Sequence, residues 1–160
     1  MIIKTLGDSD VQILIDIAID TFQPFYEGYV RDLLGETVFQ HQHGHWREGY
    51  ATDIPTLDDP KSGRHVAIAE IDEAIIGFVS WKIGVKPNHG EIHLLAVSEP
   101  CRREHVGREL CLYAMAEMKR SGIDVVEIGT GGDAFHLPAR SLYESLGFTP
   151  IPVVAYLKKI

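Results

Sequence analysis

The stretch that decides the fold is Glu91–Arg108, EIHLLAVSEPCRREHVGR. Its first part, Glu91–Val97, is apolar and compatible with a strand, and the proline that follows stops that strand because proline cannot donate to a sheet ladder. A run with helical period then begins at Gly107. The start of a helix carries free backbone N–H groups and the positive end of a dipole. With Arg102 and Arg103 beside that end, the stretch predicts a site for pyrophosphate or a similar anion.

The chain after this stretch continues as a helix and a strand. The apolar residues beyond Gly107 fall on one helical face, and Gly122 is typical of the residue just past a helix end. Ile123–Ile128 is an apolar strand with two acidic interruptions. A strand–helix–strand unit of this length predicts parallel pairing with a right-handed crossover.

The C-terminal part predicts one more helix and further strands. Pro138–Leu146 has a proline near its first turn, which favours a short helix closed by Gly147. Phe148 is expected to start a strand, and Val153–Leu157 is predicted as the last strand.

The N-terminal part predicts a strand and a helix. Met1–Leu6 is a short strand, and Asp8-Ser9-Asp10 offers capping side chains for the helix that follows. Apolar residues at helical spacing continue to Phe22, and Pro24 is expected to end or break the helix.

The region from Phe25 to about Thr56 is the least regular, and one or two short helices with loops are predicted there. Its aromatic residues either line a substrate cleft or form a small cluster under a long loop. The HQHGH run at positions 41–45 is not expected to bind a metal, because metal ligands converge from more than one local run.

Two further strands are predicted before the central stretch. His65–Ile71 and Ala74–Ile83 are joined by a tight turn at Asp72-Glu73, and a second turn leads into Glu91–Val97. These three strands are expected to be antiparallel neighbours. The whole pattern predicts one α/β domain over residues 1–160, with a mixed, mostly antiparallel sheet flanked by helices.

Composition limits the class of protein. The 160 residues are 45% hydrophobic, which supports a packed core and argues against disorder. A net charge of −8 disfavours general nucleic-acid binding, and no apolar run is long enough to cross a membrane. Cys101 and Cys111 form no disulfide framework, so a cytoplasmic protein with reduced thiols is expected.

The segment from Arg102 to Gly107 resembles the acyl-CoA signature of the GNAT superfamily of N-acetyltransferases, [Arg/Gln]-x-x-Gly-x-[Gly/Ala]. Here it is Arg-Arg-Glu-His-Val-Gly, so His105 replaces the first glycine of the signature. A polar residue fits such a turn if its φ is negative, and we expect a negative φ for His105.

A second segment, Ala139–Phe148 or ARSLYESLGF, resembles the other hallmark of this family, Asn-x-x-Ala-x-x-Leu-Tyr-x-x-x-Gly-Phe. Its alanine, leucine, tyrosine, glycine and phenylalanine are all in place, while His136 occupies the asparagine position. The resemblance covers roughly Val66 to the C-terminus. It implies the GNAT fold with a β-α-β acetyl-CoA-binding core, and a transfer of acetyl from acetyl-CoA to a primary amine in a ternary complex, without a metal.

The transfer needs a base near the amine and an acid near the sulfur, because the amine must be neutral to attack and the thiol leaves as a thiolate. The resemblance implies that Tyr143 is the acid. Side chains alternate along a strand, so Glu91, His93, Leu95 and Val97 are expected to share one face. The base is then Glu91, whose pKa partial burial would raise, or His93, or a water relay.

The remaining implied contacts concern the two substrates. The resemblance places the coenzyme against the backbone of Leu95, Ala96 and Val97, against Arg102, Arg103, His105, Val106, Gly107 and Arg108 at the pyrophosphate, and against His136. The candidates to line the acceptor pocket are Tyr26, Tyr29, Trp46 and Trp81, although Trp81 also suits the core. A small-molecule amine is the expected acceptor, with polyamine-like or aminoglycoside-like compounds suiting the acidic charge. No nucleic-acid or membrane partner is expected, and a homodimer is allowed. A protein acetyltransferase or a non-catalytic acyl-CoA-binding module are the alternatives.

Overall fold

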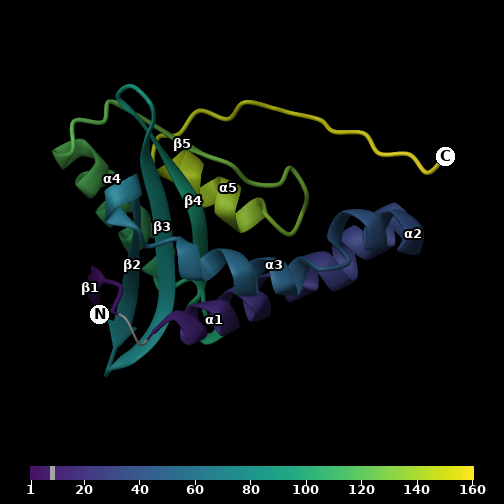
Figure 1. Ribbon diagram of the computed structural model, residues 1–160, viewed down its shortest axis with the longest axis horizontal. Coiled ribbons are helices and arrows are strands. Elements are labelled where there is room, and N and C mark those ends of the chain that lie inside the picture. Colours follow the sequence, from purple (N-terminus) through teal and green to yellow (C-terminus); the bar gives the residue numbers. More distant parts are fainter. Residues whose placement is uncertain (8–9) are drawn as a thin grey trace.

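The computed structural model describes residues 1–7 and 10–160, and its centre is a five-stranded sheet in the order β1-β2-β3-β4-β5 (Figure 1). The first four strands pair antiparallel with their neighbours, and β5 pairs parallel to β4. The strands are β1 Ile2–Thr5, β2 Arg64–Ile71, β3 Ala74–Lys86, β4 His89–Val97 and β5 Val125–Ile128.

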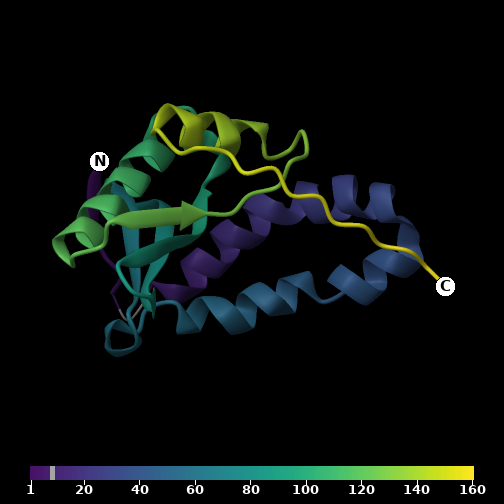
Figure 2. The same cartoon turned by 90° about the horizontal axis from the view of Figure 1, so that it is seen from above.

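Helices cover both faces of this sheet, as the two views show (Figures 1 and 2). One core cluster joins the sheet to α4 and α5, and a second joins the opposite face to α1. The helices are α1 Val11–Gln23, the π-helix η1 Pro24–Val30, α2 Arg31–His43, α3 Trp46–Asp53, α4 Val106–Arg120 and α5 Leu137–Ser145. Short 3₁₀ turns occupy Ile54–Thr56, Pro60–Ser62 and Glu99–Cys101.

The predicted sheet is confirmed in its main features. Asp72 and Glu73 form the tight turn between β2 and β3, with φ of 48° and 66°. The strand after α4 is parallel to β4, as the length of the crossover predicts. Gly122 follows α4 with φ of 81°, so it is the left-handed residue past the helix end. Cys111 is fully buried on the core face of α4.

The prediction that Pro24 ends or breaks the first helix is confirmed for the α-helix, because α1 ends at Gln23, directly before the proline, but the helical conformation does not stop there. The chain continues through Pro24 into η1 and then into α2, with a sharp interruption only at Gly35, whose φ is 72°. A π-helical turn displaces the hydrogen-bond register, which accommodates the missing N–H of the proline. Residues 24–53 are therefore more helical than predicted, and they extend away from the sheet (Figure 1).

The strands predicted at Phe148 and over Val153–Leu157 do not form, although Phe148 packs against the α4 and α5 side of the core. Residues 149–160 carry no helix or strand in the described chain and run away from the sheet (Figure 2). A strand needs a hydrogen-bonding neighbour, and this segment has none among the described residues. Of the predicted capping residues, Asp8 and Ser9 lie outside the described residues, and Asp10 is the N-cap residue of α1.

Candidate active site

A β-bulge interrupts β4 at His93, one of the two residues predicted as the base. On β3 the neighbours Ser80 and Trp81 pair with Leu94 and Ile92 of β4. His93 lies between these two residues of β4 and has no partner on β3. Bulges of this kind bend a strand and redirect its side chains, and they recur beside active sites.

The bulge changes which side chains share a face of the sheet. Ile92 and Val97 both pack on the α4 side, although they are five positions apart. Glu91, as the neighbour of Ile92, therefore points to the opposite side. The prediction that Glu91, His93, Leu95 and Val97 share one face is wrong, because simple alternation cannot anticipate the extra residue.

Glu91 forms a short network on the face away from α4. Its Oε2 lies 2.8 Å from Nζ of Lys82 on β3, and its Oε1 lies 3.3 Å from Nδ1 of His93. Burial alone would raise the pKa of Glu91, but the hydrogen bonds from Lys82 and His93 outweigh burial and lower it. The expected rise of this pKa is therefore wrong, although Glu91 and His93 do lie within hydrogen-bond distance of each other.

The edge of β4 facing β5 opens after the bulge. Pairing with β5 ends at Ile92 opposite Ile128, while β3 continues to pair with β4 as far as Val97. Among the described residues, no strand covers the β5-facing edge of Leu94–Val97. Leu95, Ala96 and Val97 thus lie beside a gap that an extended ligand with amide groups can enter.

The turn before α4 has an unusual backbone. Arg103 has φ of 68° and His105 has φ of 61°, both in the left-handed region. The prediction that His105 keeps a negative φ is wrong: the histidine adopts the conformation for which a glycine is normally used. Histidine is one of the residue types that enter this region more often than most.

The backbone beyond His105 begins α4 at Val106, so the first N–H groups of the helix face this turn. Arg102 does not extend freely here. Its Nε donates to the carbonyl oxygen of Val97 at 3.0 Å, and its terminal nitrogen lies 3.4 Å from Oγ1 of Thr21 on α1. Arg103 is exposed and Arg108 is on the first turn of the helix. These two are the arginines that an anion at the helix start would meet.

Tyr143 lies on α5 and is buried, with 9% of its surface exposed. Its ring meets that of Phe148 edge to face at 6.1 Å between centroids. Burial, and to a smaller extent the nearby Cys111, raises the pKa of Tyr143 far above its ordinary value. The phenol therefore keeps its proton at neutral pH, as a general acid must before it acts.

His136 is held by Asp133 in the loop before α5. Nδ1 of His136 lies 2.8 Å from Oδ2 of Asp133, and the backbone N–H of His136 donates to Oδ1 of the same carboxylate. Arg140 fixes the loop by donating to the carbonyl oxygens of Gly131 and Asp133. The ring of His136 also contacts Phe25 of η1. The loop therefore lies against the helical arm, the segment of residues 24–53 that extends away from the sheet.

Three of the four aromatic acceptor candidates belong to that arm. Tyr26 and Trp46 stack with 4.7 Å between ring centroids, and Trp46 donates its indole N–H to Glu27. Tyr29 is 40% exposed, the most open of the set. Trp81, by contrast, is 4% exposed in the core between the sheet and α4.

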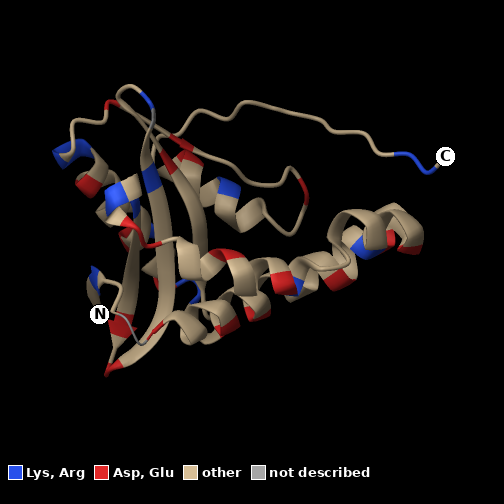
Figure 3. Cartoon of the chain, in the orientation of Figure 1, with Lys and Arg blue, Asp and Glu red and all other residues tan. Residues whose placement is uncertain are grey.

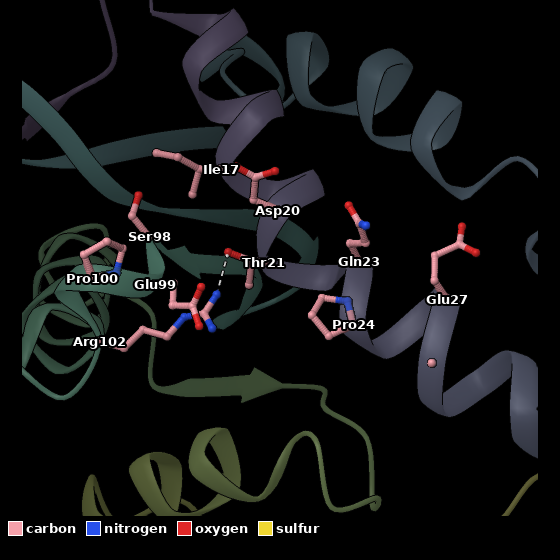
Figure 4. A pocket seen from close by; sticks show the side chains of 11 residues that line it. Ile17, Asp20, Thr21, Gln23, Pro24, Glu27, Ser98, Glu99, Pro100 and Arg102 are labelled. Carbon is pink, nitrogen blue, oxygen red and sulfur yellow. Dashed lines mark hydrogen bonds between the residues drawn. The ribbon is translucent and has the colours of Figure 1, made fainter.

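A cavity of about 600 Å³ lies between the end of α1, the start of η1 and the turn after β4 (Figure 4). Carboxylates dominate its charged groups: Asp20, Glu27 and Glu99 line it together with Arg102. Glu27 is already paired with Arg31 and Arg47, which leaves Asp20 and Glu99 facing the space. Asp and Glu also recur along α1, α2 and α3 (Figure 3).

Several of these groups were not singled out from the sequence. Lys82 and Thr21 act on β4 from other elements, so no local pattern points to them. Asp133 is different, because an Asp three residues before His136, the N-cap residue of α5, is a usable capping signal. None of the described helices has both the length and the apolar character that a membrane crossing requires.

Comparison with known proteins bears on the family and the fold. Residues 19–148 match the model of the acetyltransferase (GNAT) family. The uncharacterized N-acetyltransferase YvbK of Bacillus subtilis is 38% identical over 63 residues, which span 39% of each chain. The matched segment is thus about two fifths of that relative.

Solved structures share the fold across nearly the whole chain. The PaiA N-acetyltransferase of Thermoplasma acidophilum, in complex with coenzyme A, has a TM-score of 0.67 at 23% identity, covering 93% of this chain and 91% of its own. An aminoglycoside 6′-N-acetyltransferase of Acinetobacter haemolyticus has a TM-score of 0.70 at 14% identity, covering 100% and 99%. With the family model spanning most of the chain, this protein belongs to the GNAT family of acetyltransferases.

Proposed function

We propose that the protein moves an acetyl group from acetyl-CoA to the primary amine of a cationic small molecule, by direct transfer in a ternary complex. The observation that carries the proposal is the open edge of β4, which leads into a turn with left-handed residues before α4, while the buried Tyr143 belongs to the core cluster that Leu95 and Val97 pack against. The edge and the turn suit the arm and the pyrophosphate of one ligand, and Tyr143 supplies an acid beside them.

The coenzyme contacts follow from backbone geometry. The uncovered edge of Leu95, Ala96 and Val97 supplies amide and carbonyl groups for the pantetheine arm. Left-handed residues in the turn before α4 create the concave arrangement of N–H groups that binds anions. The N–H groups of Val106, Gly107 and Arg108 at the start of α4 continue this surface, and Arg103 lies beside it. Arg102 fixes the turn by donating from its Nε to the carbonyl oxygen of Val97.

His136 is the least direct of these coenzyme contacts. Its Nδ1 is occupied by Asp133, so only Nε2 is free to meet the pantetheine arm. The tie to Asp133 gives that nitrogen a fixed direction, as a positioned contact requires.

The chemistry needs one acid and one base. Acetyl-CoA supplies the acetyl group as a thioester, which a neutral amine attacks without a covalent enzyme intermediate. Tyr143 donates its phenolic proton to the leaving sulfur. His93 accepts a proton from the ammonium group, and Glu91 orients it through the 3.3 Å contact to Nδ1. Because Lys82 keeps Glu91 ionised, we assign Glu91 the orienting role and His93 the proton transfer.

The acceptor is proposed to enter the cavity beside α1. Its wall presents Asp20 and Glu99, which repel a phosphate but attract an ammonium group. Tyr26 and Tyr29 on η1 and Trp46 on α3 extend this side with aromatic surface that suits cationic groups. Trp81 lies in the core on the α4 face of the sheet and is not part of this wall. Names of fold relatives include aminoglycoside acetyltransferases, which is consistent with such an acceptor. The rival acceptor is a lysine or α-amine of a protein.

Replacing Tyr143 with Phe tests the acid. The ring still fills the core, so folding and coenzyme affinity are expected to stay near wild type while kcat falls at least about 100-fold. Tyr113→Phe on α4 removes a hydroxyl outside the site and serves as the matched control. Steady-state kinetics with thiol release measures both. Equal kcat in wild type and Tyr143→Phe would remove the tyrosine from the mechanism.

The base is tested by the pH dependence of kcat/KM, whose acidic limb reports the free enzyme's essential base. In His93→Ala this limb is expected to disappear, with a loss of roughly 100-fold near neutral pH. Glu91→Gln is expected to keep the limb and lose less activity, because it only orients His93. A limb that persists unchanged in His93→Ala would show that the base is another group or a water relay.

An acceptor panel separates the remaining alternatives. Acetylation of polyamines or aminoglycosides but not of peptides is expected. Acetylation of peptides alone would indicate a protein acetyltransferase. Coenzyme A binding without turnover on any amine would indicate a non-catalytic acyl-CoA-binding module.

A further inference from the structure

Arg102 lies on the boundary between the two proposed substrate sites. It belongs to the turn before α4, where the coenzyme anion is proposed to bind, yet its side chain lines the cavity beside α1 (Figure 4). Asp20 and Glu99 line the same cavity, and Arg102 is the one cation among the described residues that do so. In this position the guanidinium group opposes the carboxylates in the space that a cationic acceptor needs.

Two contacts hold the Arg102 side chain in the cavity. Its Nε donates to the carbonyl oxygen of Val97 at 3.0 Å, and its terminal nitrogen lies 3.4 Å from Oγ1 of Thr21 on α1. The Thr21 hydroxyl in turn lies 3.5 Å from the same carbonyl oxygen, to which it donates. Helix α1 and the turn before α4 are therefore joined at one backbone oxygen.

The carbonyl of Val97 points to the open edge of β4. The N–H of the next residue, Ser98, donates to the carbonyl oxygen of Ile76 on β3 at 2.9 Å. Successive residues of an antiparallel strand present their backbone groups to opposite edges, so the N–H and C=O of Val97 point away from β3. A carbonyl oxygen has two lone pairs, and Arg102 and Thr21 take both. An amide N–H of a ligand arm must displace one of them to bond with this oxygen.

We propose that Arg102 is a positioning residue that couples the acceptor cavity to the coenzyme site, an inference that rests on the function proposed above. When the coenzyme lies along β4, an amide of its arm replaces Arg102 on the Val97 carbonyl, and the guanidinium group turns to the pyrophosphate. Arginine pairs with phosphate through two parallel hydrogen bonds, which offset the lost contacts to Val97 and Thr21. Asp20 and Glu99 then face the cavity without an opposing cation, so an ammonium group binds there more tightly.

The coupling is measured as a change in affinity. The probes are two cationic amines, spermidine and neamine, titrated into the full-length chain by calorimetry with and without saturating coenzyme A. Coenzyme A carries no acetyl group, so no turnover disturbs the titration. It is expected to lower the dissociation constant of at least one probe by about 10-fold or more. By linkage, that probe should tighten the binding of coenzyme A by the same factor.

Arg102→Met tests the residue itself, because methionine keeps an unbranched apolar side chain and removes the charge and both hydrogen bonds. Without coenzyme, this variant is expected to bind the amine about 10-fold more tightly than wild type, and the coupling factor is expected to fall to about 2. Thr21→Val removes one contact to Arg102 and is expected to lower the coupling factor by less.

Arg103→Met is the matched control, because it makes the same change in net charge one position away and Arg103 does not line the cavity. It is expected to weaken coenzyme A binding. At saturating coenzyme A it should keep the wild-type coupling factor, and without coenzyme it should keep the wild-type affinity for the amine.

The contrary outcomes separate this inference from the proposed function. Equal amine affinity with and without coenzyme A in the wild type would overturn the coupling and leave the cationic acceptor standing. Equal gains in amine affinity in Arg102→Met and Arg103→Met would also overturn it, because net charge alone would then explain them. If Arg102→Met does not fold, an unchanged coupling factor in Thr21→Val overturns it instead. No binding of either probe in the presence of coenzyme A would overturn the proposed acceptor class, and the coupling with it.

Discussion

His105 carries a local conformational cost that a single substitution can release. At φ of 61° its Cβ crowds the backbone, which costs roughly 1–2 kcal/mol in an L-residue. Glycine removes this cost but adds freedom to the unfolded chain, so His105→Gly is expected to raise the free energy of unfolding by about 0.5–1 kcal/mol. Thermal melts should then shift upward by about 1–3 °C.

The neighbouring Glu104 provides the control for that substitution. Glu104 does not have a positive φ, so a glycine there relieves no strain and only adds freedom to the unfolded chain. Glu104→Gly should therefore lower the free energy of unfolding. If both glycine variants melt below the wild type, the strain assigned to His105 is absent.

Residue identity predicted some of the site and not the rest. Tyr143 was singled out because its neighbours along the helix form a recognisable motif, and its role as the acid remains a proposal. The positive φ of His105 was not predicted. The same residues fit a turn with either sign of φ, and the sign is fixed only by the direction in which the chain enters α4. The lowered pKa of Glu91 could not be predicted either, since Lys82 reaches it from another strand.

At the scale of elements, the pairing of β3 with β4 should show in the pH dependence of stability. Glu91 has a lowered pKa in the folded state, so its contribution is present above the unfolded carboxyl pKa of about 4.3 and is lost as pH falls through the lower folded value. Lys82→Gln is expected to destabilise by roughly 0.5–1 kcal/mol at pH 7 and by progressively less below about pH 4.

Chemical denaturation at several pH values measures this difference. Lys61→Gln, on the exposed turn before β2, is the control and should show no such trend. A stability gap between wild type and Lys82→Gln that stays constant down to pH 3 would exclude the ion pair as its cause.

Elements were predictable where one period persists and unpredictable where the register shifts. The period of α4 and the alternation of β2 and β3 gave their positions to within a few residues. The bulge at His93 and the π-helix after Pro24 each insert an offset into a regular pattern. Such offsets are selected by contacts with a neighbouring strand or helix, which a single segment does not reveal.

At the scale of the whole molecule, the sequence pattern predicted three antiparallel neighbours and the parallel β4–β5 pair. It did not predict that the C-terminal residues would have no strand partner among the described residues, because pairing depends on where the chain runs after α5. It also did not predict the acidic cavity, because the lining residues come from three separate parts of the chain: α1, η1 and the turn after β4.

Coenzyme binding should stabilise the entire molecule. A ligand that binds only the folded state at 100 times its dissociation constant adds about 2.7 kcal/mol, or about 5–10 °C in melting temperature for a chain of this size. Because the proposed pyrophosphate site combines a helix start with Arg103, this shift should shrink as salt is raised. Arg103→Ala should reduce both the shift and its salt dependence. Arg120→Ala, at the opposite end of α4, should leave both unchanged at equal protein concentration. Equal losses in the two variants would mean that the chain's general charge, and not the turn before α4, holds the anion.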